Sequence, residues 1–275
     1  MSWGPAGDKR GSSVWPITER RQRVMLRTRD GVAIDASYEP GPGGPEAPAI
    51  VLAHGFTGDL ERPHVRRAAA VFAQRAAVVT FSFRGHGRSG GRSTVGDKEV
   101  LDLAAAVEWA RSLGHARVVT VGFSMGGSVV LRQAALHRGR TEAHVDGVVA
   151  VSAPARWFYR GTAPMRRVHW AVTRPAGRLV SRFGLGTRIH PYDWDPVPLS
   201  PVESVPLIAP TPLLVVHGDR DPYFPVDHPR MLLGAAADGG AELWLEAGMG
   251  HAENAASDEL IERIGAWVAA TLAAQ

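Results

Sequence analysis

One strand-turn-helix pattern in this sequence carries a side chain that could act as a nucleophile. Residues 118–127 read VVTVGFSMGG, in which Gly122 and Gly126 flank Ser124 at a distance of two positions. A serine held at a sharp turn between a strand and a helix presents its hydroxyl above the sheet, and the glycines avoid a collision with neighbouring backbone. The first turn of the helix would also direct N–H groups at any negative charge that develops there. The pattern favours a nucleophilic serine over a glycine-rich turn with a surface serine.

A serine hydroxyl becomes a strong nucleophile only when an imidazole takes its proton and a carboxylate orients that imidazole. Downstream of Ser124, an apolar run ending at His217 continues into Gly-Asp-Arg-Asp-Pro, which offers Asp219 and Asp221, and Gly-Met-Gly later precedes His251. Both segments follow the carboxyl end of an expected strand, where parallel α/β sheets gather their functional residues. The order serine, acid, histidine suits a nucleophile on such a turn. We therefore expect His251 to be the base and one of the two aspartates to be the acid.

Short apolar runs alternate with longer amphipathic runs over most of the chain, which predicts βα units and a largely parallel sheet. An Asp30-Gly31 turn in front of them predicts an initial hairpin. The expected strands span 24–29, 32–38, 49–53, 77–83, 118–123, 145–151, 213–217 and 242–245. The expected helices span 64–75, 97–112, 125–138, 229–236 and 258–273. Because most of the strands are almost continuously apolar, helices should cover both faces of the sheet.

The chain of 275 residues, 45% of them hydrophobic, is long enough for one substantial domain. Its Gly-, Ser- and charge-rich first segment, residues 1–20, is expected to form a flexible arm. Residues 21–152 and 211–275 should form the core. Roughly sixty residues separate the sixth and seventh strands, which is too long for a structureless connection. We therefore expect residues 153–210 to be an insertion, with one helix over 163–183.

Five motifs together resemble the α/β-hydrolase superfamily over nearly all of the chain beyond the first segment. They are His54-Gly55-Phe56, Arg84–Gly90 (RGHGRSG), Gly122–Gly127 (GFSMGG), His217–Asp221 (HGDRD) and Gly250-His251. The second and third resemble those of monoacylglycerol-lipase-like and cinnamoyl-esterase-like members. The resemblance implies a mostly parallel eight-stranded α/β-hydrolase sheet with helices on both faces and a lid formed by the insertion. It also implies a triad of Ser124, Asp221 and His251, because the family's acid position falls on Asp221 rather than Asp219.

Attack on a carbonyl also creates an oxyanion, which needs preorganised hydrogen-bond donors. One expected donor is the backbone N–H of Met125, the residue after the nucleophile. The resemblance implies that the other is the backbone N–H of Phe56. Three further histidines, His54, His86 and His217, are expected to form local or structural contacts rather than to act as the base.

The insertion is rich in aromatic and basic side chains. Its aromatics could build an apolar pocket, and we expect Trp157, Phe158 or Trp170 to reach the substrate while others join the insertion to the core. The insertion also carries Arg156, Arg160, Arg166, Arg167, Arg174, Arg178, Arg182 and Arg188. We interpret these as solvated side chains in preference to a site for an anionic substrate group or an acidic membrane surface.

Composition excludes several classes of function. The absence of cysteine excludes disulfides, thiolate chemistry and Cys-ligated metal sites. A formal net charge of +4, with no basic run or aromatic-interleaved basic stripe, does not indicate nucleic-acid binding.

No apolar stretch has the length of a signal peptide or a membrane span, so we expect a cytoplasmic protein without stable membrane insertion. No motif indicates a metal or organic cofactor. The oligomeric state cannot be read from the residues.

The favoured function is hydrolysis of carboxylic esters, esterase-like or lipase-like, through an acyl-enzyme intermediate. Suitable substrates include short to medium acyl esters, aryl esters and monoacylglycerols. Thioesterase, peptidase and other acyl-transfer or perhydrolase chemistry use the same triad, because the triad defines a style of reaction and not a substrate. The non-enzymatic alternative is a ligand-binding protein that keeps the fold but does not turn over a substrate.

Overall fold

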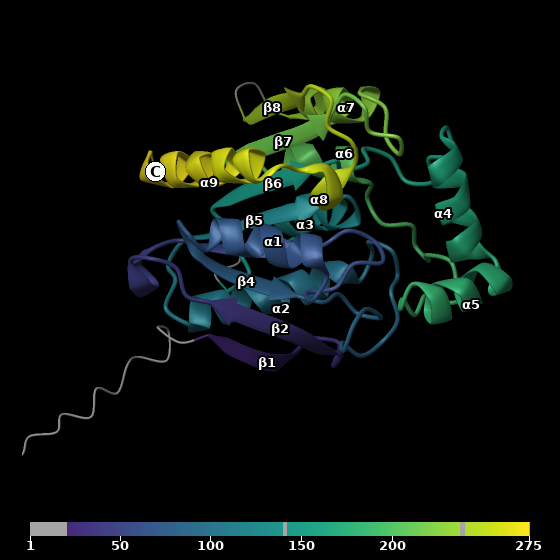
Figure 1. The fold of residues 1–275 in the computed structure, drawn as a ribbon, viewed down its shortest axis with the longest axis horizontal. Coiled ribbons are helices and arrows are strands. Elements are labelled where there is room, and N and C mark those ends of the chain that lie inside the picture. Colours follow the sequence, from purple (N-terminus) through teal and green to yellow (C-terminus); the bar gives the residue numbers. More distant parts are fainter. Residues whose placement is uncertain (1–20, 140–141, 237–239, 275) are drawn as a thin grey trace, which may run out of the picture.

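One eight-stranded sheet organises the part of the chain that this computed structural model describes, residues 21–139, 142–236 and 240–274 (Figure 1). The strands are β1 (Gln22–Arg27), β2 (Ala33–Glu39), β3 (Ala49–Ala53), β4 (Ala77–Phe81), β5 (Val118–Phe123), β6 (Gly147–Val151), β7 (Leu213–Gly218) and β8 (Ala241–Glu246). Their spatial order is β1-β2-β4-β3-β5-β6-β7-β8. β2 is antiparallel to both β1 and β4, and all other neighbours are parallel. The expected eight-stranded, mostly parallel sheet is confirmed, and the expected arm of residues 1–20 lies outside the described residues.

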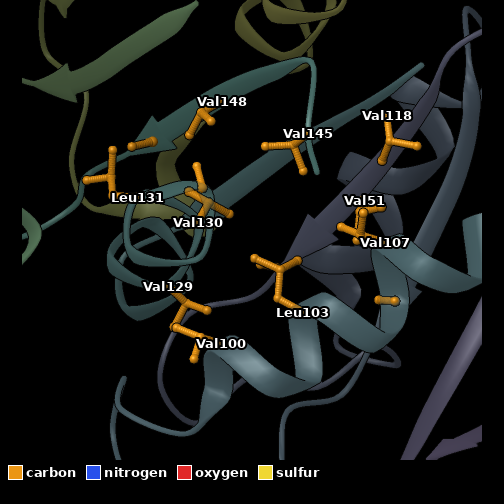
Figure 2. Close-up of a cluster of buried hydrophobic side chains, with 14 of the residues drawn as sticks. Val51, Val100, Leu103, Val107, Val118, Val129, Val130, Leu131, Val145 and Val148 are labelled. Atoms are coloured by element: carbon orange, nitrogen blue, oxygen red, sulfur yellow. The ribbon is translucent and has the colours of Figure 1, made fainter. Parts of the chain in front are cut away.

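Helices cover both faces of this sheet, as the apolar strands predict. α1 (Pro63–Phe72) and α9 (Asp258–Ala273) pack on one face, and α2 (Glu99–Ser112), α3 (Met125–Leu136) and α7 (Asp227–Ala235) pack on the other. Figure 2 shows Leu103 and Val107 of α2 beside Val51 of β3 in the second of these interfaces. The ends of these helices and of the strands differ from the expected ones by three residues or fewer.

The expected single helix over 163–183 is wrong, because the structure has two helices there. α4 spans Ala163–Thr173, and α5 (Pro175–Gly184) begins after one extended residue, Arg174. Proline has no backbone N–H and forces the preceding residue out of the helical conformation. Arg174 accordingly has φ −98° and ψ 138°, which are extended values. The direction of the chain therefore changes at Pro175, and the two helices pack against each other.

The insertion leaves the sheet after β6 and returns before β7, and α4 and α5 stand apart from the sheet at one end of the molecule (Figure 1). Hydrogen bonds join its return path to the loop after β4. The backbone N–H of Arg188 donates to Gly85, and the indole N–H of Trp194 donates to the carbonyl of Thr94 at 2.7 Å. Short helices α6 (Pro201–Ser204) and α8 (Ala252–Ala255) and the 3₁₀ segments Gly44–Glu46 and Val205–Leu207 complete the described helical elements.

The RGHGRSG motif forms the turn after β4, and its arginine anchors this turn in the core. The buried guanidinium of Arg84 donates to two carboxylates. It donates to Oδ1 of Asp102 in α2 at 2.8 Å and to Oδ2 of Asp30 in the turn of the first hairpin at 2.7 Å. Asp102 also accepts from the backbone N–H of Arg84. A buried guanidinium requires such paired acceptors, because an unpaired charge in the interior is strongly destabilising. The motif thus fixes the turn after β4 at the edge of the sheet where the parallel strands have their carboxyl ends.

Candidate active site

The turn at Ser124 has the strained geometry that its sequence indicates. Ser124 has φ 51° and ψ −113°, between the end of β5 and the start of α3. A Cβ atom added to Gly122 would lie 2.2 Å from the carbonyl oxygen of Gly126, and one added to Gly126 would lie 2.2 Å from the carbonyl oxygen of Ala53. No side chain fits at such distances, so both glycines are required for α3 to begin this close to β3 and β5. Strain of this kind persists only where the surrounding structure enforces it.

Ser124, His251 and Asp221 come together at the carboxyl edge of the sheet. The Oγ atom of Ser124 lies 2.9 Å from Nε2 of His251, and Nδ1 of His251 lies 2.7 Å from Oδ2 of Asp221. These residues follow β5, β8 and β7, respectively. Because a carboxylate only accepts hydrogen bonds, Nδ1 of the neutral ring carries the proton, and Nε2 is left to accept the serine hydroxyl proton.

Asp221 is buried and ionised. Its side chain is fully shielded from solvent, and its Oδ1 accepts the backbone N–H groups of Tyr223 at 2.8 Å and Phe224 at 3.1 Å. Burial acts to raise the pKa of this carboxyl, but the hydrogen bond and charge of His251, with the two backbone donors, hold the pKa below its usual value. The carboxylate therefore stays negative at neutral pH and stabilises an imidazolium on His251.

The two aspartates of the HGDRD motif have different surroundings. Asp219 is exposed, and its Oδ1 accepts the backbone N–H of Gly248 at 2.6 Å, which ties the turn after β7 to the turn after β8. Asp221 is the one that contacts His251. Of the two aspartates, the structure thus places Asp221 next to His251 and Asp219 in the turn contact.

The three other candidate histidines are buried and occupied by local contacts. The Nδ1–H of His54 donates to the carbonyl of Gly55 at 2.7 Å, and its Nε2 accepts the backbone N–H of Phe83 at 3.0 Å. Burial and the neighbouring charge of His86 lower the pKa of His54 to about 3. His86 itself donates to the carbonyl of Arg84, and His217 donates to that of Phe224. Among the described residues, the hydroxyl of Ser124 is hydrogen-bonded to His251 and to none of these three.

Two aromatic rings that the motifs did not single out hold the imidazole of His251 in place. Tyr223 stacks on it with ring centroids 4.3 Å apart, and Phe224 meets it edge to face at 5.6 Å. Both rings lie within three positions of Asp221, so the backbone groups that bind the carboxylate and the rings that contact the imidazole belong to one short turn. The only sequence signal for this contact was the position of the two aromatic residues just after the expected acid. That signal is weak, because aromatic residues after a turn are common.

The two expected oxyanion donors belong to different segments that meet at the cleft of Ser124. Phe56 follows β3 and Met125 opens α3, and both line the same cleft as Ser124. Among the described residues, neither backbone N–H donates to another protein group. Two free donors beside a serine hydroxyl are what a developing oxyanion requires.

A buried glutamate supports the loop that carries Phe56. Oε1 of Glu253 accepts the backbone N–H of Gly55 at 3.0 Å, and the residue is 7% exposed. Glu253 lies two residues after His251 in α8, and its own carbonyl accepts a hydrogen bond from Arg67 of α1. The carboxylate therefore links the histidine segment to the loop that carries Phe56. No sequence motif singled out this residue.

A cleft of about 1070 Å³ opens over Ser124 and His251. The insertion supplies much of its lining, including Trp157, Phe158 and Trp170, so the three expected pocket residues do border it. Trp157 is half-buried and packs edge to face on Trp194 at 5.1 Å. Phe158 and Trp170 are 59% and 47% exposed. The cleft is mainly apolar in lining and fits an organic substrate of moderate size.

Within the described ranges, no cluster of three or more His, Asp or Glu side chains could hold a metal ion. A second cavity, of about 750 Å³, lies between β1, β2 and α1 and contains none of the residues discussed above as candidates. Its arginines Arg21 and Arg23 are paired with Glu39, Asp35 and Glu61. The chemistry available to this fold therefore centres on the cleft over Ser124.

Comparison with known proteins agrees with this architecture. The model of the alpha/beta hydrolase fold family matches residues 48–171. A monoacylglycerol lipase of Mycolicibacterium smegmatis is 29% identical over 241 residues, which cover 74% of this chain and 80% of the relative. An esterase of Pyrococcus furiosus has a similar structure, with a TM-score of 0.71 and 24% identity over 93% of this chain and 92% of that one. The esterase domain of a Rhodothermus marinus protein aligns with a TM-score of 0.60 and 19% identity, covering 91% of this chain and 97% of that domain.

Proposed function

Because this chain is a member of the α/β-hydrolase superfamily, we propose that it hydrolyses carboxylic esters through an acyl-enzyme intermediate on Ser124. The observation that carries the proposal is the continuous hydrogen-bonded row from the Ser124 hydroxyl through His251 to Asp221. A ligand-binding protein without turnover would have no need of a strained serine, an oriented imidazole and a buried carboxylate in this order.

The proposed reaction has two halves. In the first, Oγ of Ser124 attacks the ester carbonyl carbon while Nε2 of His251 accepts the hydroxyl proton, and the N–H groups of Phe56 and Met125 bind the oxyanion. The tetrahedral intermediate then expels the alcohol, which takes its proton from His251. In the second half, His251 accepts a proton from water, the hydroxide attacks the acyl carbonyl, and Ser124 leaves with the proton that His251 returns.

We propose that the insertion, residues 153–210, is a lid and that its aromatics bind the apolar part of the ester. The cleft volume and its aromatic lining support substrates of short to medium acyl chain, aryl esters or monoacylglycerols. The similarity to a monoacylglycerol lipase points to the same class. Contact of Trp157, Phe158 or Trp170 with the substrate follows from their position on the wall of the cleft.

The proposal is tested by labelling the folded protein with a fluorophosphonate and by assaying a panel of esters. We expect the probe to attach to Ser124, which peptide mass spectrometry would identify. We also expect turnover of p-nitrophenyl esters and monoacylglycerols, with a maximum at one acyl length between acetyl and palmitoyl. A folded protein that neither reacts with the probe nor turns over any ester, thioester or amide of the panel would contradict the proposal.

Replacing Glu253 is expected to impair catalysis through the oxyanion loop. Glu253→Ala removes the acceptor of the Gly55 N–H, so the following N–H of Phe56 is no longer fixed. Since displacement of a catalytic group by about 1 Å can cost about 100-fold in rate, we expect kcat to fall about 10- to 100-fold with KM little changed. Steady-state kinetics with a soluble aryl ester would measure this.

Glu253→Gln is the matched control, because its amide oxygen can still accept the Gly55 N–H. It should recover most of the lost kcat. Equal losses in both variants would show that the charge of Glu253, rather than this hydrogen bond, is what matters. A loss of thermal stability without any change in kcat would assign Glu253 a structural role only.

A further inference from the structure

Helix α5 turns its apolar face away from the protein. Ala176, Leu179, Val180 and Phe183 follow the spacing i, i+3, i+4, i+7, which normally marks the face of a helix that packs on a core. Here Leu179, Val180 and Phe183 are 57%, 51% and 76% exposed. Such an outward apolar stripe on a helix of ten residues requires a partner, because large exposed apolar patches on soluble proteins mark interaction surfaces.

The opposite face of α5 is the one that packs within the insertion. Gly177 and Ser181 are buried there, and a Cβ atom added to Gly177 would lie 2.3 Å from the carbonyl oxygen of Trp170 in α4. The close approach of the two helix backbones fixes the orientation of α5. Its apolar stripe therefore cannot turn toward α4 without separating the pair.

Arg178 and Arg182 belong to α5 and Arg174 directly precedes it, and the described insertion has no acidic residue before Asp193. Of its eight arginines, only Arg156 forms an ion pair, with Asp227, among the described residues. Arg182 lies over the ring of Phe183, with its guanidinium carbon 5.3 Å from the ring centroid. The surface thus combines an exposed apolar centre with uncompensated positive charge.

The placement of this surface relates it to the cleft. α4 packs against α5 and supplies Met165, Val168 and Val172 to the cleft lining. Leu185, directly after α5, borders the same cleft. A surface that binds α5 would therefore lie at the entrance through which an apolar substrate reaches Ser124.

The sequence alone favours solvated arginines over a membrane surface, but the exposed apolar stripe beside Arg182 changes that interpretation. We propose that the outward face of α5, with its flanking arginines, docks on the surface of an anionic lipid bilayer. An amphipathic basic helix binds such a surface by burying its apolar residues at the headgroup boundary while its arginines contact the acidic lipids. A second copy of this chain is a poorer partner, because symmetric contact would bring two sets of unpaired arginines together. None of the helices in the described part of the chain combines the length and apolarity needed to cross a bilayer.

Vesicle sedimentation with the full chain tests this proposal. We expect the protein to sediment with phosphatidylcholine vesicles that contain about 30% phosphatidylglycerol, much less with phosphatidylcholine alone, and to be released by about 0.5 M NaCl. Leu179→Ser with Phe183→Ser should weaken binding at least about tenfold, since both side chains would lie in the apolar layer. Arg174→Gln with Arg182→Gln should weaken it by about 25-fold, because each arginine near an anionic surface contributes about fivefold.

Leu136→Ser with Arg230→Gln is the matched control, since both residues are exposed on helices outside the insertion. This variant should bind vesicles as the unchanged protein does. Hydrolysis of a short soluble ester should stay constant in all three double variants, which would show that they fold.

Ser124→Ala should bind vesicles normally, so docking and the proposed chemistry can fail separately. The proposal is overturned if anionic vesicles do not bind the protein, or if the α5 variants bind them as well as the control does. It is also overturned if the unchanged protein is a dimer without lipid and the α5 variants are monomers, because a second copy would then cover this face.

Discussion

Replacing Ser124 with alanine is expected to lower kcat for a soluble aryl ester by about 10⁴- to 10⁶-fold, because members of a triad act as a unit and the attacking group is lost. The backbone should tolerate the change, since the Oγ of Ser124 contacts only Nε2 of His251 among the described side chains. Fluorophosphonate labelling should disappear. The midpoint of thermal unfolding should stay the same or rise slightly, because alanine also removes a polar group from the cleft.

Ser128→Ala is the matched control for this variant. Ser128 lies one turn further along α3, is buried, borders the cleft, and its hydroxyl has no partner among the described residues. Its loss should leave kcat within about tenfold, since no step of the proposed reaction uses it. If Ser124→Ala retained activity within the same range, the nucleophile would be another residue.

Replacing Asp221 with asparagine is expected to have the second-largest effect, a fall in kcat of about 10⁴-fold. The amide is neutral and can present its NH₂ group to Nδ1 of His251, which would favour the tautomer that cannot accept the proton of Ser124. KM should change much less, because Asp221 is fully shielded from solvent and does not line the cleft. Steady-state kinetics with the same ester would separate the two parameters.

Asp219→Asn distinguishes this role from a general effect of charge near the site. Its side-chain oxygen can still accept the N–H of Gly248, and the residue is exposed. We expect kcat within about tenfold of the unchanged protein. The reverse outcome, a severe loss in Asp219→Asn and a mild one in Asp221→Asn, would mean that Asp219 rather than Asp221 is the acid of the triad.

The site could be located from the sequence to the extent that its parts are local. The strained turn at Ser124 needs Gly122 and Gly126 within two positions of it, so the requirement is written in adjacent residues. The motifs around Asp221 and His251 likewise follow recognisable strand ends. By contrast, the stacking of Tyr223 on His251 depends on how the turns after β7 and β8 approach each other, which adjacent residues do not specify.

The expected single helix of the insertion was wrong because Pro175 lies inside the expected range. The apolar residues of α4 and α5 continue with nearly helical spacing through the proline, so periodicity alone suggests one helix. The missing N–H of Pro175 and the extended Arg174 decide against it. A proline within a long periodic run is therefore better treated as a boundary than as a tolerated kink.

By itself, the sequence predicted the eight strands and the three candidate side chains. It also predicted the order of serine, acid and histidine along the chain. These features rest on hydrophobic periodicity and on backbone requirements that act over a few residues. Only the tertiary structure decided that Glu253 binds the N–H of Gly55, 198 positions away, and that α5 presents its apolar stripe to solvent. The physical reason is that contacts between distant segments, and the choice of which helix face is buried, depend on packing against neighbours that no local pattern identifies.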